Sequence, residues 1–168
     1  MHGARIAVLE AAVKITSSAF HDGTSIPTRY AHRGVTGGNN LSLPFSWNDK
    51  PAETKSFALS IIDPHPVAKN WVHWFVINIP AEINELTEGA SQRSMPNGCR
   101  ELRSTYGTIG YGGPEPPKGS GVHPYVVTLF ALRIDALNLH EKSTLKEFTT
   151  AIEEVVIEHA IMTGYYER

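Results

Sequence analysis

The segment WVHWFVINI, residues 71–79, constrains the fold of this chain more than any other stretch. It is apolar at both odd and even positions, which is typical of a central strand covered on both faces. Strict alternation of side chains predicts that Trp71, His73 and Phe75 share one face and that Trp74 lies on the other. The chain must therefore supply a layer of structure on each side of this strand.

Two further segments have the composition of buried strands. Residues 54–63, TKSFALSIID, alternate apolar and small side chains, so Asp63 at the end shares a face with Ile61. Residues 125–134, YVVTLFALRI, are β-branched and aromatic. Clusters of Pro, Gly and Asn separate such runs over the first four fifths of the chain, so we predict a mainly β fold, either a sandwich or another β-rich sheet.

The C-terminal quarter changes to a helical period. Thr144, with Glu147 three residues later, fits a capping box at the start of a helix, and Gly164 fits its end. The segment PAEINELTEG, residues 80–89, weakly indicates a second helix. Side chains that would form one apolar face of the C-terminal helix recur every three or four residues: Leu145, Phe148, Ile152, Val155, His159 and Met162.

Composition limits the class of protein. The chain has 168 residues, 41% of them hydrophobic and 19% charged, which is ordinary for one soluble globular domain. No segment approaches the roughly 18 uninterrupted apolar residues of a membrane span. A formal net charge of -2 without blocks of like charge gives little basis for nucleic-acid binding, so small ligands or proteins are the expected partners. Cys99 is the only cysteine and we find no signal-peptide pattern, so we expect a cytoplasmic protein without an intrachain disulfide.

Polar side chains gather at the ends of the predicted strands. Asp63 ends one strand, His73 lies near the start of the next, and His123 and Tyr125 share a face at the start of the third. Imidazole and phenol groups donate hydrogen bonds to an anion, and a carboxylate can orient an imidazole. With Trp71 as an aromatic wall, these residues predict a pocket for a phosphate-type or carboxylate group.

A long segment without regular structure is predicted at residues 106–124, where Pro and Gly take up about half of the positions. Loops of this length in compact domains are usually functional or disordered, and the aromatic and proline residues here favour an ordered loop. Pro114, Pro116 and Pro117 would also reduce the entropy lost if the loop docked on a partner protein.

A metal site and an enzyme are alternatives to a binding pocket. Asp63, His65, His73 and His123 are ligand types that zinc or iron accept, but their spacing matches no known metal motif, so we predict no metal and no cofactor. An enzyme that uses Asp63, His73 and His123 for acid-base or metal-assisted chemistry is the alternative function. Ser120 lacks the Gly-x-Ser-x-Gly nucleophile elbow because a lysine occupies the first glycine position.

Several motifs, in this order along the chain, resemble the signatures of one family. They are ITSSAFHDGTSIPTRYA at 15–31, GGNNLSLPFSW at 37–47, DPHP at 63–66, WVHWFVINIP at 71–80 and GYGGPEPPKGSGVHPY at 110–125. Together they resemble the phosphatidylethanolamine-binding protein (PEBP) family, also called Raf kinase inhibitor protein-like, and in particular its bacterial and archaeal branch. The resemblance implies a single domain at residues 13–168 and leaves residues 1–12 as an N-terminal extension.

The resemblance also implies a fold and a site. The fold is a PEBP-like β-sandwich with a few peripheral helices, including the C-terminal helix. The site is a small anion pocket at one end of the sandwich that accepts phosphate or phosphoethanolamine groups. Carried over by position, its ligand-binding residues are Asp63, Trp71, His73, Gly113, Pro117, His123 and Tyr125.

Three positions depart from the family pattern. His65 stands where the family usually has a second aspartate, Pro124 where it has an arginine, and Glu115 where prokaryotic relatives often carry a cysteine. The first two changes remove one negative and one positive charge near the pocket, so they bear on headgroup preference.

From these observations we expect a non-enzymatic binding protein for a small anionic ligand. Members of the family inhibit kinases or serine proteases, so a kinase or a protease is an expected class of partner protein. Relatives are often dimeric, and the apolar segment at residues 5–13 would add contacts in a homodimer. A protein that docks on its partner through the Gly/Pro-rich loop is a third interpretation.

Overall fold

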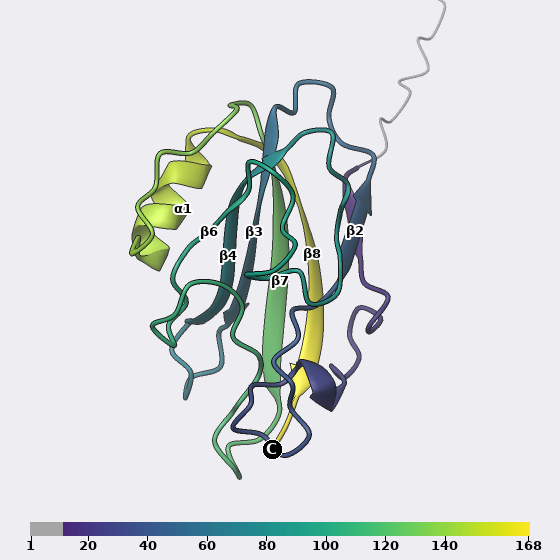
Figure 1. Cartoon of the computed structure of the whole chain (residues 1–168), viewed down its shortest axis with the longest axis vertical. Helices are drawn as coiled ribbons and strands as arrows, with labels where there is room; N and C mark the ends of the chain where they lie inside the picture. Colours follow the sequence, from purple (N-terminus) through teal and green to yellow (C-terminus); the bar gives the residue numbers. More distant parts are fainter. Residues whose placement is uncertain (1–11) are drawn as a thin grey trace, which may run out of the picture.

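The structure, a computed structural model, describes residues 12–168. Two antiparallel sheets form the framework of this part of the chain (Figure 1). The smaller sheet has the spatial order β1-β2-β5, with β1 (Lys14–Thr16), β2 (Phe45–Asn48) and β5 (Glu85–Leu86). The larger sheet has the order β6-β4-β3-β7-β8, with β3 (Ser56–Asp63), β4 (Trp71–Pro80), β6 (Arg100–Glu101), β7 (His123–Leu132) and β8 (Val156–Tyr166).

The interior between the two sheets is filled by aromatic and aliphatic side chains from both. Trp47 of β2 meets Phe57 of β3 in an edge-to-face contact with ring centroids 5.6 Å apart. Val127 of β7 and Met162 of β8 belong to the same core. This arrangement confirms the predicted β-sandwich, in which each sheet buries one face against the other.

β4 is the central strand that the sequence predicted, because it pairs with β3 on one side and with β6 on the other. Trp74 packs in the core between the sheets, whereas Phe75 and Ile77 pack in a second core on the opposite face of the larger sheet. The strands predicted at residues 54–63 and 125–134 are also present, as β3 and β7.

A β-bulge at His73 interrupts the alternation of side chains along β4. Trp74 pairs with Ile61 and Val72 pairs with Ile62, so His73 is an extra residue between two consecutive pairs. A bulge of this kind bends the strand and redirects a side chain. Here it lets His73 face the end of the sandwich core, where a cavity opens.

The bulge corrects one sequence prediction. Trp71 and His73 do line the same cavity, but Phe75 lies in the core on the opposite face of the sheet. The prediction that all three share a face was wrong because strict alternation holds only for a strand without an inserted residue.

One α-helix, α1 (Leu145–Glu153), covers the outer face of the larger sheet (Figure 1). The predicted capping box is present: the Glu147 amide donates to Thr144 Oγ1 at 3.2 Å, and the Thr144 amide donates to Glu147 Oε2 at 2.6 Å. Phe148 stacks on Phe75 with ring centroids 4.2 Å apart, which fixes the helix over the second core.

The predicted C-terminal helix ends earlier than the sequence pattern indicated. The chain leaves the helical conformation after Glu153, and residues 156–166 form β8, which pairs with β7 along its length. The β-branched run from Val155 to Ile157 favours strand over helix, and the pairing with β7 decides between them. Gly164 lies within β8, where an added Cβ would press on Ile26, so it gives room for packing and does not end a helix.

The prediction of a second helix at residues 80–89 was also wrong. This segment forms a turn and then the short strand β5, which pairs with β2. Among the described residues, the other helical element is a single 3-10 turn, η1 (Thr28–Tyr30). No helix within residues 12–168 has the length and apolar character needed to cross a membrane. Residues 1–11, which hold most of the predicted N-terminal extension, lie outside the described residues.

Replacing Thr144 by alanine should lower the free energy of unfolding by about 1 kcal/mol, because the N-cap hydroxyl would no longer accept from the Glu147 amide. Thr149, exposed in the middle of α1, is the matched control, since alanine there has the higher helix propensity and should leave stability unchanged or slightly raised. Urea unfolding followed by circular dichroism measures both variants. An equal decrease in the free energy of unfolding in the Thr144→Ala and Thr149→Ala variants would contradict the capping role of Thr144.

Candidate functional site

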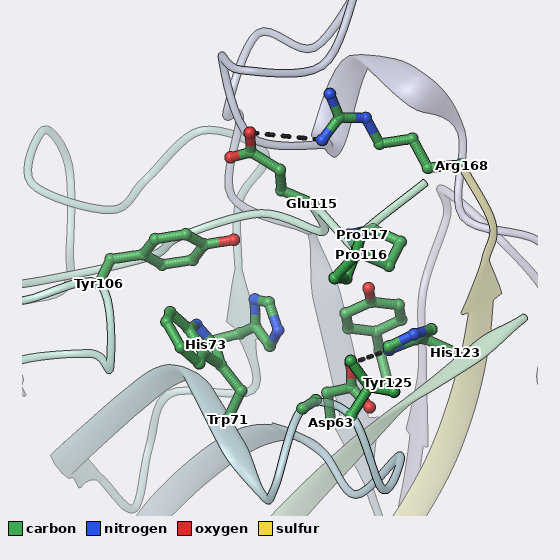
Figure 2. A pocket seen from close by; sticks show the side chains of 12 residues that line it. Asp63, Trp71, His73, Tyr106, Glu115, Pro116, Pro117, His123, Tyr125 and Arg168 are labelled. Carbon is green, nitrogen blue, oxygen red and sulfur yellow. Dashed lines mark hydrogen bonds and ion pairs between the residues drawn. The ribbon is translucent and has the colours of Figure 1, made fainter. Parts of the chain in front are cut away.

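A cavity of about 300 Å³ opens at the end of the sandwich where β3 ends and β4 and β7 begin (Figure 2). The long loop before β7 and Arg168 form its outer rim. Its lining residues are Asp63, Val67, Ala68, Trp71, His73, Tyr106, Glu115, Pro116, Pro117, His123, Tyr125 and Arg168. Six of the seven ligand-binding residues predicted from the sequence are in this set.

Asp63 and His123 form a buried pair in the cavity wall. Ile62 pairs with Val126 across β3 and β7, which brings the two residues to the same end of adjacent strands. His123 Nδ1–H donates to Asp63 Oδ2 at 2.6 Å, and the exposed fractions are 0% for His123 and 2% for Asp63. The other carboxylate oxygen of Asp63 accepts from the His65 amide at 2.8 Å. Both oxygens are therefore held, and the imidazole is fixed in one orientation.

His73 is a neutral acceptor on the other side of the cavity. Burial lowers its pKa to about 4, although its hydrogen bond to the Gly112 carbonyl opposes that shift. Because a carbonyl can only accept, Nδ1 carries the proton and donates to the Gly112 oxygen at 2.7 Å. Nε2 is therefore unprotonated and has a lone pair available to a ligand.

Two donors in the lining have no hydrogen-bond partner within the described residues. The Tyr125 hydroxyl forms none and points from the floor of the cavity toward Pro116 and Pro117 (Figure 2). Burial raises the pKa of Tyr125, so this group stays protonated. The indole N–H of Trp71 is buried and also lacks a partner. Buried polar groups are rarely left unsatisfied, so these two donors mark a place where a polar ligand would be stabilised.

Charged side chains meet at the rim of the cavity. The Glu115 carboxylate lies 2.6 Å from His32 Nδ1 and 3.6 Å from Arg168 Nη1, and Figure 2 shows the contact with Arg168. His32 is fixed in turn by stacking on Tyr106, with ring centroids 4.4 Å apart. A Cβ at Gly34 would collide with the Glu115 carboxylate, so the absence of a side chain there makes room for this network.

Gly113 is the predicted site residue that does not line the cavity. Its amide donates to Asn40 Oδ1 at 2.7 Å, and its carbonyl accepts from the Tyr106 hydroxyl at 2.7 Å. An added Cβ would collide with the carbonyl of Tyr30. Gly113 therefore lies behind the wall and positions Tyr106, which does line the cavity.

Several lining residues were not predicted from the sequence. Tyr106 lies in the Gly/Pro-rich loop that the sequence marked as functional, so its aromatic ring was the available signal. Val67 and Ala68 lie in the turn that joins β3 to β4, and only their place after Asp63 pointed to the site. Arg168 could not be predicted as a lining residue, because the neighbouring sequence does not indicate which end of the sandwich it reaches.

The structure shows no set of ligands for the alternative metal site among the residues it describes. Within residues 12–168, no three His, Cys, Asp or Glu side chains are close enough together to hold an ion. His65, one of the suggested ligands, instead stacks on His123 with ring centroids 3.8 Å apart. The stacking restrains the plane of the His123 ring from one side.

Comparison with known proteins agrees with this geometry. The model of the phosphatidylethanolamine-binding protein family matches residues 16–167. The chain belongs to the phosphatidylethanolamine-binding protein family. Within this family, it is 37% identical to the UPF0098 protein YbhB of Escherichia coli over 133 residues, which are 77% of this chain and 84% of YbhB.

Other family members extend the comparison to almost the whole chain. A UPF0098 protein of Methanothermobacter thermautotrophicus is 36% identical over 157 residues, covering 93% of this chain and 99% of that protein. The crystal structure of Escherichia coli YbcL, described as a new member of the mammalian PEBP family, superposes with a TM-score of 0.88 at 31% identity and covers 94% of this chain and 99% of YbcL. These matches establish the PEBP fold.

The low pKa of His73 predicts a specific dependence of stability on pH. An unfolded histidine has a pKa of about 6.5, so between roughly pH 6.5 and pH 4 the unfolded chain binds a proton that the folded chain does not. This contribution to stability is complete above pH 6.5 and decreases as the pH falls, by up to about 3 kcal/mol.

His73→Asn keeps a side-chain N–H near the Gly112 carbonyl but removes the titrating group. The free energy of unfolding of this variant should therefore fall less steeply than that of the natural protein between pH 7 and pH 4.5. Urea unfolding at both pH values measures the difference. Parallel pH profiles for the two proteins would show that His73 is not held neutral.

Proposed function

We propose that this PEBP-family protein binds a small anionic group of the phosphate or phosphoethanolamine type in the cavity beside Asp63 and His123. The observation that carries the proposal is the pair of donors, the Tyr125 hydroxyl and the Trp71 indole N–H, which have no partner within the described residues. Phosphate oxygens accept hydrogen bonds strongly, and a donor already in place needs little reorganisation to meet them.

The protonation of His73 defines the ligand further. Its Nε2 can only accept, so the ligand should present a donor to it as well as acceptors to Tyr125 and Trp71. A monoprotonated phosphate group has both, since its second pKa is about 6. An ammonium group next to a phosphate would provide the donor in a different position.

The size of the cavity favours a headgroup over a whole lipid. About 300 Å³ lies at the lower end of the range for small-molecule sites. The lining offers aromatic walls at Trp71 and Tyr106, with ring centroids 5.2 Å apart. The proposed ligand is therefore a compact polar group.

Tyr125→Phe should weaken binding of inorganic phosphate by about tenfold and leave stability nearly unchanged, because the hydroxyl it removes bonds to no described residue but would donate to a charged ligand. Isothermal titration calorimetry with phosphate and with phosphoethanolamine measures the affinity.

Tyr111→Phe is the matched control for this experiment. The Tyr111 hydroxyl donates to the Tyr30 carbonyl at 2.9 Å and lies outside the cavity lining, so its removal should cost about 1 kcal/mol of stability and leave affinity unchanged. The proposal fails if Tyr125→Phe binds both compounds as tightly as the natural protein does.

Glu115→Gln should strengthen phosphate binding by about fivefold, or ~1 kcal/mol. The carboxylate now lies beside Arg168, so an incoming anion must compete with it for the guanidinium and is also repelled by its charge. Glutamine keeps the shape of the side chain without the charge.

Glu88→Gln is the control for the charge change, because Glu88 pairs with the exposed Arg29 at 3.1 Å, away from the cavity. Its phosphate affinity should equal that of the natural protein. A weaker affinity in Glu115→Gln would mean that Glu115 supports the ligand instead of competing with it. A kinase or protease partner, a homodimer and a cytoplasmic location stay predictions from the sequence.

A further inference from the structure

The imidazole of His123 has a second polar contact on the side of the ring opposite Asp63, with the hydroxyl of Ser120. Ser120 Oγ is 2.9 Å from His123 Nε2, and His123 Nδ1 is 2.6 Å from Asp63 Oδ2. We propose that Ser120, His123 and Asp63 form a nucleophilic triad that accepts the acyl group of a small activated ester. This activity goes beyond the binding function and does not depend on it.

The three residues hold the relations that define such a triad, which is recognised by geometry and not by sequence motif. Asp63 is buried, accepts from Nδ1–H and so directs Nε2 toward the serine. The stacked ring of His65, at 3.8 Å between centroids, keeps the imidazole plane in place. Ser120 lacks the nucleophile elbow, and this argued against it in the sequence. The elbow is one strand-to-helix turn that presents a nucleophilic serine, and the same chemistry can be built on a different backbone.

Ser120 lies where a substrate can reach it. It is partly exposed in a turn that its own amide closes by donating to the Pro117 carbonyl at 3.1 Å, whereas its two partners are buried. The next residue, Gly121, has a positive φ of 88°, and its amide donates to no described residue. That N–H is the available donor for the oxyanion of a tetrahedral intermediate. Ser120 is not among the residues that line the cavity, so the fitting substrate has a short acyl chain.

The hydroxyl proton of Ser120 has two places to go. Ser120 Oγ also lies 2.6 Å from the Pro117 carbonyl, so the hydroxyl donates there when His123 carries protons on both nitrogens. When Nε2 is unprotonated, the hydroxyl donates to it instead, and this second arrangement is the nucleophilic one. The only cysteine does not compete for the substrate, because burial raises the pKa of Cys99 to about 11.

The reaction then follows the usual course of acyl transfer. Ser120 Oγ forms a bond to the ester carbonyl carbon as its proton passes to His123 Nε2. The bond to the leaving alkoxide breaks, and the alkoxide takes that proton. Solvent water attacks the acyl-serine, His123 accepts the water proton and returns it to Ser120 Oγ, and a carboxylic acid leaves.

Acylation of the whole chain by 4-nitrophenyl acetate tests the triad, with the modified residue located by peptide mass spectrometry. Ser46 is exposed on β2 and serves as the comparison within the same molecule. We expect Ser120 to be acetylated about 10²- to 10⁴-fold faster than Ser46, the usual gain from a positioned general base. Ser120→Ala should lose the fast phase of nitrophenol release, and Ser46→Ala should keep it.

Two results would overturn the triad. One is equal acetylation rates at Ser120 and Ser46 in the natural protein, which needs no variant and so cannot be confused with misfolding. The other is an unchanged rate at Ser120 in a folded His123→Gln variant. Phosphate titration of the same preparation reports on the binding function separately, so failure of either proposal can be told from failure of the other.

Discussion

The buried hydrogen bond between Asp63 and His123 is the interaction on which the rest of the site depends. Removing a carboxylate from water is costly unless hydrogen bonds replace the lost hydration, and here His123 and the His65 amide supply them. Because Asp63 ends β3 and His123 begins β7, the pair requires these two strand ends to meet in one register. The turn after Asp63 and the turn before His123 are then brought over the cavity from opposite sides.

The bulge at His73 organises the long loop around that pair. The His73 imidazole donates to the Gly112 carbonyl, and the Gly112 amide donates to the His73 carbonyl at 2.9 Å. The Tyr106 hydroxyl and the Asn40 side chain then bond the backbone of Gly113. A loop without helix or strand is thus ordered by hydrogen bonds to the bulge in β4 and to two side chains outside that strand, which satisfy the buried backbone groups of Gly112 and Gly113.

The sequence predicts the parts of this molecule that depend on local pattern. Alternation put Asp63 on the inner face of β3, and the spacing of His123 and Tyr125 put both on one face of β7. With Trp71 and His73 of β4, five of the twelve lining residues followed from strand ends alone. Register and distant pairing were not predictable in this way. The bulge at His73 arises from the pairing of β4 with β3, and β8 is a strand because β7 lies beside it, although its apolar spacing also fits a helix.

The charges of the cavity explain what can make it selective. Arg168 lies against Glu115, and Asp63 is bonded to His123, so each full charge in the lining already faces an opposite or protonatable group. Pro124 stands where the resemblance led us to expect an arginine, and it adds no cation. A site with paired charges attracts an anion weakly over distances beyond the Debye length, which is about 8 Å at physiological salt. Selection therefore depends on short-range donors, and Tyr125 can donate only one hydrogen bond, to a group that fits beneath Pro117.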